Sequence, residues 1–139
     1  MSISHEQRNH IRQLAGHCCE YCRLAEDSRL VKFQIDHIIP LKHSGTDETE
    51  NLCLACLKCN SFKGANVAAL DPETGEATKL YNPRQQQWDD HFQINNNATL
   101  EGKTPEGRAT INVLRINEES RVKHRQMLMM LEEYPCNKE

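Results

Sequence analysis

The chain has 139 residues with 17 basic and 20 acidic side chains, a formal net charge of −3, and an aromatic content of 5%. This length fits one domain with a modest core. The slightly negative charge argues against a protein that coats nucleic acid non-specifically, since such a protein is clearly basic. It does not exclude a nuclease, because divalent cations and a local basic patch can outweigh the overall charge at a site.

The N-terminus carries no apolar signal segment, and no apolar run is long enough to span a membrane. We therefore expect a cytoplasmic protein without a membrane partner. The chain has seven cysteines. In a reducing compartment, paired cysteines hold metal ions more often than they form disulfides, so a metal staple is the expected support for the small core.

The first predicted element is a helix over residues 4–15. Ser4 followed by Gln7 matches a capping box. Gly16 suits the position just past the helix end.

Residues 30–39 are predicted to form a strand, because they are rich in apolar and β-branched side chains. Asp36 and His37 lie side by side within this run. Neighbouring strand residues point to opposite faces, so a bend or bulge is needed to bring both side chains to one site. Pro40 ends the strand because it cannot donate to a sheet ladder. A carboxylate beside an imidazole suggests a metal ligand next to a proton acceptor.

A polar loop at 42–50 follows, order returns at Asn51, and the turn at 56–59 is expected to lead into a short helix. The second half is predicted to be mainly helical. Its expected elements are a turn at 71–75, a short helix from Asn82 and Pro83, a turn at 95–97, a helix from Thr104 to about Asn117, and a last helix near 118–134 that buries Val122, Met129 and Leu128 or Leu131.

Two groups of side chains in this half have competing interpretations. Trp88, His91 and Phe92 are expected to form core rather than a base-stacking platform. A set of basic residues is expected on a solvated helix face, with a DNA-backbone surface as the alternative. These basic residues are Arg108, Arg115, Arg121, Lys123 and Arg125.

Two Cys-x-x-Cys turns flank the central strand and loop, Cys19 with Cys22 and Cys56 with Cys59. Four thiolates match tetrahedral zinc, and four protein ligands leave no open position, so such a zinc is structural. A redox dithiol or buried thiols are the alternatives, but a redox motif needs only one pair. Cys53 could replace Cys59, since it also forms a Cys-x-x-Cys with Cys56.

We favour Cys56 and Cys59 because they border the next motif. Cys18, Cys53 and Cys136 are then expected to be small buried or surface thiols.

In chain order the motifs are Cys-x-x-Cys, Asp36-His37, Asn51 with Leu52, and Cys-x-x-Cys-Asn60-x-x-Lys63. Residues 19–63, including Gly45 in the loop, resemble the HNH endonucleases, also called ββα-metal nucleases. The resemblance implies an α+β fold with a small zinc-stapled ββα-metal core and an N-terminal helix. We expect a single domain over residues 1–139, with the core at 17–65 and a helical C-terminal extension at 66–139.

Residues 81–92 and 104–110 more loosely resemble an extension found in some bacterial and phage-type HNH proteins.

The resemblance implies a metal-dependent endonuclease that hydrolyses DNA phosphodiester bonds. His37 is the expected general base. Asp36 and Asn60 are the expected oxygen ligands of a catalytic Mg²⁺ or Mn²⁺. Asn51 is expected to orient the His37 segment.

Lys63 and His43 are candidate contacts to substrate phosphate, with stem packing and a solvated loop histidine as alternatives. Duplex DNA is the expected partner, although the residues do not distinguish DNA from RNA. The main alternative is a zinc ribbon that binds nucleic acid or protein without turnover. That role needs no combination of Asp36, His37 and Asn60.

Overall fold

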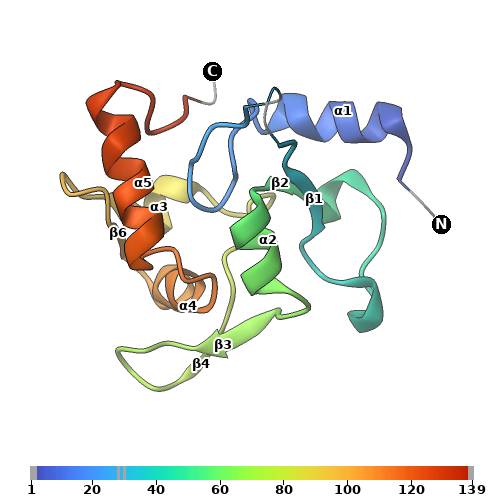
Figure 1. Cartoon of the computed structure of the whole chain (residues 1–139). Helices are drawn as coiled ribbons and strands as arrows, with labels where there is room; N and C mark the ends of the chain where they lie inside the picture. The colour runs from blue at the N-terminus through green and yellow to red at the C-terminus, as the bar shows by residue number, and fades with distance from the viewer. Residues whose placement is uncertain (1–2, 28, 30, 138–139) are drawn as a thin grey trace.

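The computed structural model describes residues 3–27, 29 and 31–137. Within these ranges the fold consists of three two-stranded antiparallel hairpins, five α-helices and two short 3₁₀ turns (Figure 1). No helix of the described residues is long and apolar enough to cross a membrane. Leu30, the first residue of the expected strand, lies outside the described ranges.

Helix α1 (His5–Leu14) confirms the first predicted element. The Ser4 side chain caps it by accepting a bond from the Gln7 backbone N–H at 3.1 Å. The Gln7 amide does not return to the cap as a capping box requires, because it donates instead to the Asp47 carbonyl at 2.6 Å. Ile11 is fully buried at the centre of the helix. The helix therefore covers the core and also holds a distant loop.

The expected ββα unit is present. Strand β1 (Gln34–His37) pairs antiparallel with β2 (Leu52–Ala55), and α2 (Leu57–Lys63) follows. Strand β1 is shorter than predicted because its pairing with β2 ends at His37. Beyond that point the backbone is bonded to Asn51. The backbone N–H of Ile38 donates to the Asn51 carbonyl at 2.8 Å.

The loop between β1 and β2 contains the two 3₁₀ turns, η1 (Leu41–His43) and η2 (Thr49–Asn51). Gly45 packs against the backbone just after β1, since a Cβ at this position would overlap the carbonyl oxygen of Ile39. A glycine is needed here because the backbone approach is close. The loop is thereby pressed onto the end of the strand that carries His37.

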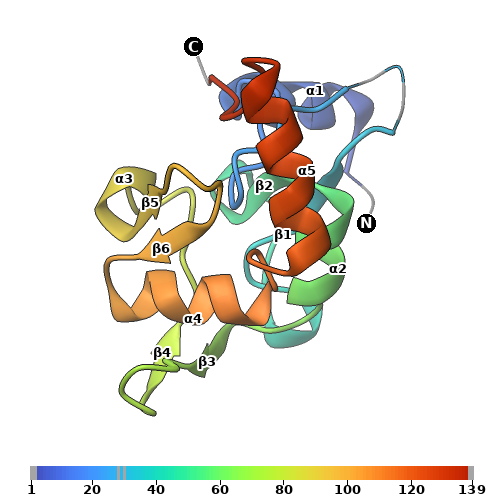
Figure 2. The ribbon, with the colours of Figure 1, turned by 60° about the vertical axis from the view of Figure 1, so that its left-hand side comes forward.

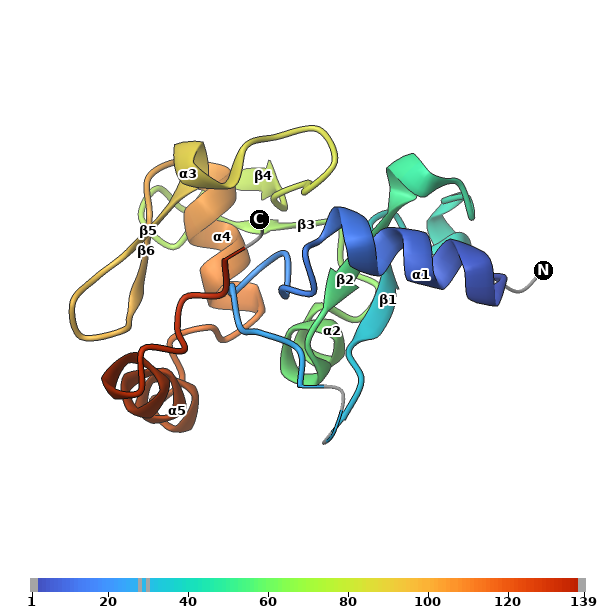
Figure 3. The same cartoon turned by 90° about the horizontal axis from the view of Figure 1, so that it is seen from above.

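The C-terminal extension is mixed rather than purely helical, because two hairpins alternate with its helices (Figure 2). Seen from above, α1 lies at the end of the molecule that holds the β1–β2 hairpin, and β5, β6, α4 and α5 lie toward the other end (Figure 3). The elements are β3 (Ala68–Leu70), β4 (Ala77–Lys79), α3 (Trp88–His91), β5 (Phe92–Ile94), β6 (Leu100–Gly102), α4 (Pro105–Val113) and α5 (Glu119–Met130).

The predicted aromatic group does form core. Trp88, His91 and Phe92 are buried, and the Phe92 ring lies 5.0 Å from that of Tyr81 and 5.1 Å from that of Trp88. The Trp88 Nε1–H donates to the Tyr21 carbonyl at 2.9 Å. This bond joins the extension to the turn that carries the first cysteine pair.

The prediction for the last helix is wrong in what it buries. In α5 the buried side chains are Arg121 and Arg125, whereas Leu131, just past its end, is 59% exposed. Arg121 donates to the Leu114 carbonyl at 2.7 Å, and Arg125 donates to the Ile116 carbonyl at 2.9 Å. Buried carbonyl groups need donors, so the two guanidinium groups cap backbone of neighbouring segments. Neither belongs to a solvated face or to a DNA-backbone surface.

Cys18 and Cys136 form a disulfide across a separation of 118 residues. The expectation that both remain thiols is therefore wrong. Near this bridge, the Tyr134 hydroxyl donates to the Cys22 carbonyl at 2.6 Å. The end of the described chain is thus fixed onto the turn that follows α1.

Candidate metal centre and catalytic site

The structure gathers Cys19, Cys22, Cys56 and Cys59 into one buried cluster whose sulfur atoms all lie within 4.8 Å of one another. The turn after α1 supplies the first pair, and the start of α2 supplies the second. Sulfur atoms around a tetrahedral zinc lie roughly 3.8 Å apart, given a Zn–S distance of about 2.3 Å. The Cys22 and Cys56 sulfurs are 3.8 Å apart. The cluster therefore fits a closed, structural zinc site.

Arg121 from α5 lies against this cluster, with its Nη2 3.0 Å from the Cys59 sulfur and 3.7 Å from the Cys56 sulfur. Burial by itself lowers the pKa of Arg121, but the charges of Cys59, Cys22 and Cys56 outweigh it and raise that pKa. Hydrogen bonds from the other cluster thiols lower the pKa of Cys22, whereas burial raises the pKa of Cys19 and of Cys59. With a divalent zinc bound by four thiolates, the guanidinium would offset the excess negative charge of the site.

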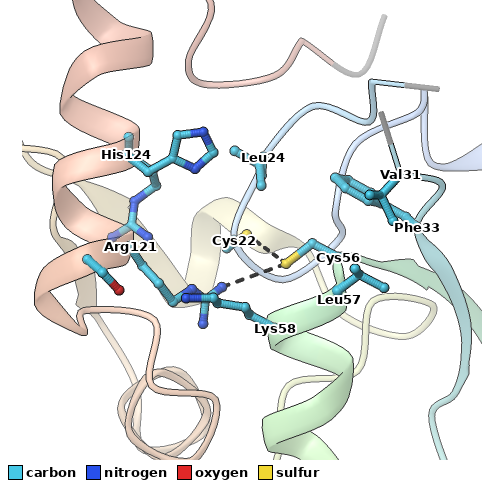
Figure 4. Close-up of a pocket in the computed structure, with 11 residues that line it drawn as sticks. Cys22, Leu24, Val31, Phe33, Cys56, Leu57, Lys58, Arg121 and His124 are labelled. Carbon is cyan, nitrogen blue, oxygen red and sulfur yellow. Dashed lines mark hydrogen bonds between the residues drawn. The ribbon is translucent and has the colours of Figure 1, made fainter. Parts of the chain in front are cut away.

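An apolar pocket of about 260 Å³ opens beside the cluster. Figure 4 shows Cys22 and Cys56 at its base, Val31 and Phe33 to one side, and Arg121 to the other. Helix α5 therefore lies close to the thiolates without closing over them completely.

Cys53 is not part of the cluster. It lies on β2, and its sulfur contacts the Tyr21 hydroxyl at 3.5 Å and the Asp36 carboxylate at 3.6 Å. Burial and the Asp36 charge raise the pKa of Cys53, which keeps it a thiol. The metal register is therefore Cys56 with Cys59, as the sequence motif favours.

Asp36 is 5% exposed and faces a set of partners within the core. The Tyr21 hydroxyl donates to its Oδ2 at 2.9 Å, and the Lys63 Nζ lies 3.2 Å from the same oxygen and 3.4 Å from Oδ1. Lys63 also donates to the His37 and Ile38 carbonyls at 3.0 and 3.1 Å. Burial raises the pKa of Asp36, and Lys63 and Tyr21 oppose that rise. An ammonium group thus already neutralises this carboxylate.

His37 has a different partner. Its Nε2 lies 2.7 Å from Oδ1 of Asp47, and both side chains are about one-quarter exposed, at 24% and 26%. The register of β1 is continuous through Asp36 and His37, without the bulge that the sequence calls for. Neighbouring side chains then point to opposite faces. Among the described residues, Asp36 and His37 share no side-chain partner.

Asn51 makes three hydrogen bonds that hold the segment after His37. Its Oδ1 accepts from the Ile39 backbone N–H at 2.8 Å, and its Nδ2 donates to the carbonyls of Ile39 at 2.9 Å and Thr46 at 2.8 Å. The Asn51 amide is thereby fully used on backbone groups. These contacts are those of a residue that positions the loop.

Asn60 and His43 are the site candidates with free side chains. Asn60 is half-buried on α2, His43 is exposed at the end of η1, and neither side chain forms a hydrogen bond within the described ranges. The Asn60 amide oxygen can serve a hard cation. The Asp36 carboxylate fits such a cation only in part, because a cation there must take the place of the Lys63 ammonium group.

Asp47 and Arg121 are functional candidates that the sequence does not reveal. Asp47 stands among several acidic residues in a polar loop, and only the fold shows that it faces His37. Arg121 stands among basic residues in an amphipathic stretch, and only the packing of α5 brings it to the thiolates. A close approach of Gln7 to the Asp47 backbone has no sequence signal either.

Comparison with known proteins agrees with this arrangement. Residues 19–66 match the family model described as HNH endonuclease. Over 120 residues the chain is 25% identical to a Bacillus thuringiensis protein named Septu protein PtuB, and the alignment covers 84% of this chain and 43% of that protein. The chain thus spans less than half the length of this relative. No solved structure matches the chain. The matched residues 19–66 contain the ββα unit and the four-cysteine cluster, so this part of the chain is similar to the HNH endonuclease family.

Proposed function

We propose that the chain is a metal-dependent endonuclease that hydrolyses phosphodiester bonds of duplex DNA at the site around His37. The observation that carries this proposal is the His37–Asp47 pair at 2.7 Å, which lies at the end of the ββα hairpin and remains partly open to solvent. Asn51 and Gly45 fix the adjoining loop. An imidazole held in this way suits a general base.

The hydrogen bond between His37 and Asp47 determines which nitrogen of the His37 ring can accept the proton of the attacking water. An ionised carboxylate only accepts hydrogen bonds, so Nε2 of His37 carries the ring hydrogen and donates a hydrogen bond to Asp47. The other nitrogen, Nδ1, then holds the free lone pair and accepts a proton from the attacking water. Asp47 also stabilises the imidazolium that forms after this transfer. Asp47 is thus a positioning residue, and His37 is the catalytic residue.

The proposed cofactors are a structural Zn²⁺ at the four cysteines and a catalytic Mg²⁺ or Mn²⁺ at Asn60 and Asp36. A hard cation at that place supplies Lewis-acid stabilisation of charge on the phosphate and the leaving oxygen. Asn60 offers a free amide oxygen. Asp36 offers its carboxylate only in competition with Lys63, which is 3.2 Å away.

Contacts to the DNA are proposed mainly with its backbone, since most protein–DNA hydrogen bonds go to phosphate and sugar. His43 is exposed within the loop between β1 and β2 and is the proposed phosphate contact of the core. Lys63 reaches phosphate only if its pair with Asp36 opens.

Incubation of the purified, zinc-loaded chain with supercoiled plasmid tests this function. We expect cleavage with Mg²⁺ or Mn²⁺ and none with EDTA. His37→Ala should lower the rate by about 10²–10⁴-fold, the usual contribution of a general base, while zinc content and circular dichroism stay unchanged. His124→Ala is the matched control, because His124 is an exposed histidine on α5. Equal cleavage by the His37→Ala and His124→Ala variants would remove His37 as the base. Matched single-stranded, duplex and RNA substrates identify the preferred nucleic acid.

A zinc-stapled binding module without turnover is the second candidate. The enclosure of Asp36 by Lys63 and Tyr21 favours it, because a carboxylate already paired with an ammonium group needs no metal. DNA binding by the wild-type chain without cleavage under any of the tested metals supports this candidate and contradicts the nuclease.

A further inference from the structure

A pocket of about 440 Å³ lies between the HNH core and the C-terminal extension. On the core side it is lined by the loop at 44–46, Asn51 and Lys63, and on the extension side by the segment at 79–82 together with Gln85 and Gln86. Its volume falls within the range of roughly 300–1,000 Å³ that is usual for small-molecule sites. The family match ends at residue 66, so one wall of this pocket belongs to the part of the chain that the family model does not cover.

The extension wall is rich in hydrogen-bond donors that have no partner in the described part of the chain. Lys79 is exposed at the end of β4 and forms no ion pair among the described residues, and the side chain of Gln85 forms no hydrogen bond there. The Asn82 Oδ1 accepts from the Arg84 backbone N–H at 2.9 Å, and the Gln86 Oε1 accepts from the Asn82 backbone N–H at 2.8 Å. Each of these two amides therefore has its oxygen engaged, and its NH₂ group makes no hydrogen bond to any described residue.

The remaining lining is apolar or acidic. Ile39, Val67 and Leu80 provide apolar surface, and Glu50 contributes a carboxylate from the core side. An apolar surface with amide NH₂ groups around it suits a nucleobase, because these groups can donate hydrogen bonds to the acceptor atoms on base edges. A phosphate suits the Lys79 side of the pocket, since Glu50 repels it at the other side.

The pocket is also lined by neighbours of the proposed catalytic residues. Thr46 lines it, and the next residue, Asp47, holds the His37 ring. Lys63 lines it as well, and its ammonium group is bonded to the His37 carbonyl at 3.0 Å. A DNA strand bound in the pocket therefore lies next to the loop that holds Asp47, the partner of the proposed base His37.

We propose that this pocket binds one nucleotide of the DNA strand that the site cuts, with its phosphate on Lys79 and its base edge on the amides of Gln85 and Gln86. The inference rests on the proposed function, and it assigns substrate recognition to the extension.

The test measures binding separately from cleavage. All variants carry His37→Ala, and a fluorescent 12-base-pair DNA duplex is titrated against each by anisotropy. Lys79→Ala should weaken binding about 3- to 10-fold at low salt and reduce the slope of log K against log salt by about one, as expected when one phosphate contact is lost. Adding Gln85→Ala should weaken it further. Lys123→Ala is the control, because that lysine is exposed on α5 and paired with Glu119 at 3.1 Å; its affinity should be unchanged.

A second measurement guards against misfolded variants. NMR spectra are recorded on the ¹⁵N-labelled His37→Ala chain, which has the wild-type pocket residues. The side-chain amide signals of Gln85 and Gln86 should shift on addition of the duplex, and those of Gln126 should not. Unchanged amide signals, or equal DNA affinities of the Lys79→Ala and Lys123→Ala variants, would overturn the pocket proposal even if the chain cuts DNA. Weakened binding in a chain that never cuts DNA would uphold the pocket and remove the nuclease.

Discussion

Replacing Lys63 by methionine removes the cation that faces Asp36 while keeping a side chain of similar length. Both side chains are buried, at 1% and 5% exposure. The substitution leaves a carboxylate without its ion pair and the His37 and Ile38 carbonyls without their donor at 3.0 and 3.1 Å. Breaking a buried pair in this way costs about 3–5 kcal/mol, a large part of the roughly 5–15 kcal/mol that stabilises a domain.

Lys58→Met is the matched control on the same helix. Lys58 and its partner Glu118 are 56% and 37% exposed and lie 3.7 Å apart. An exposed pair of this kind contributes about 0–1 kcal/mol. Both variants are unfolded by guanidinium chloride in the presence of zinc, with Trp88 fluorescence as the signal.

The loss in Lys63→Met should depend on pH. Burial raises the pKa of Asp36 above its value in the unfolded chain, and Lys63 opposes that rise. A raised carboxyl pKa means that the folded state binds the proton more tightly, so stability falls as the pH rises from the unfolded pKa through the folded one. Without Lys63 the pKa rises further. The free energy lost in Lys63→Met should therefore be larger at pH 8 than at pH 5.

The same variant tests whether Asp36 can hold the catalytic cation. With the ammonium group gone, Mg²⁺ or Mn²⁺ at about ten times its dissociation constant should stabilise Lys63→Met by about 1.4 kcal/mol, and should stabilise the wild type less.

A loss in the free energy of unfolding of Lys63→Met below about 1 kcal/mol, or equal losses at pH 5 and pH 8, would refute the buried ion pair. No stabilisation by either metal would exclude Asp36 as a ligand.

Three further substitutions test the staples of the fold. Cys59→Ser should release zinc and unfold the core, since a structural zinc contributes folding energy directly, whereas Cys53→Ser should keep its zinc; zinc analysis after gel filtration distinguishes them. Arg121→Leu should speed zinc transfer to a chelator about 10-fold or more, because a group that supports the metal ligands is lost. Lys123→Leu is the control, and equal transfer rates for the two variants would contradict this role of Arg121. Cys136→Ser opens a loop closed over 118 residues and should lower the free energy of unfolding by about 2–4 kcal/mol with zinc retained, as thermal unfolding with and without a reductant would show.

The sequence by itself determined the parts of this protein that depend on local spacing. Ser4 and Gly16 mark the ends of α1 because capping and positive φ are properties of single residues and their close neighbours. The paired Cys-x-x-Cys turns predict the cluster because each turn by itself directs two sulfurs to one point. The order strand, loop, strand and helix follows from the same motifs.

Only the tertiary structure decided which side chains meet across long separations. Lys63 is 27 positions from Asp36, and Arg121 is 62 from Cys59. No local periodicity reports such distances, so the sequence predicted a solvated Arg121 and did not show that Lys63 faces Asp36, whereas the fold buries all three side chains. The regular strand register likewise places the side chains of Asp36 and His37 on opposite faces, and the fold brings Asp47 within hydrogen-bond distance of His37. A buried polar group without a partner costs free energy. Which partner it has depends on which distant segment the tertiary packing brings into contact with it.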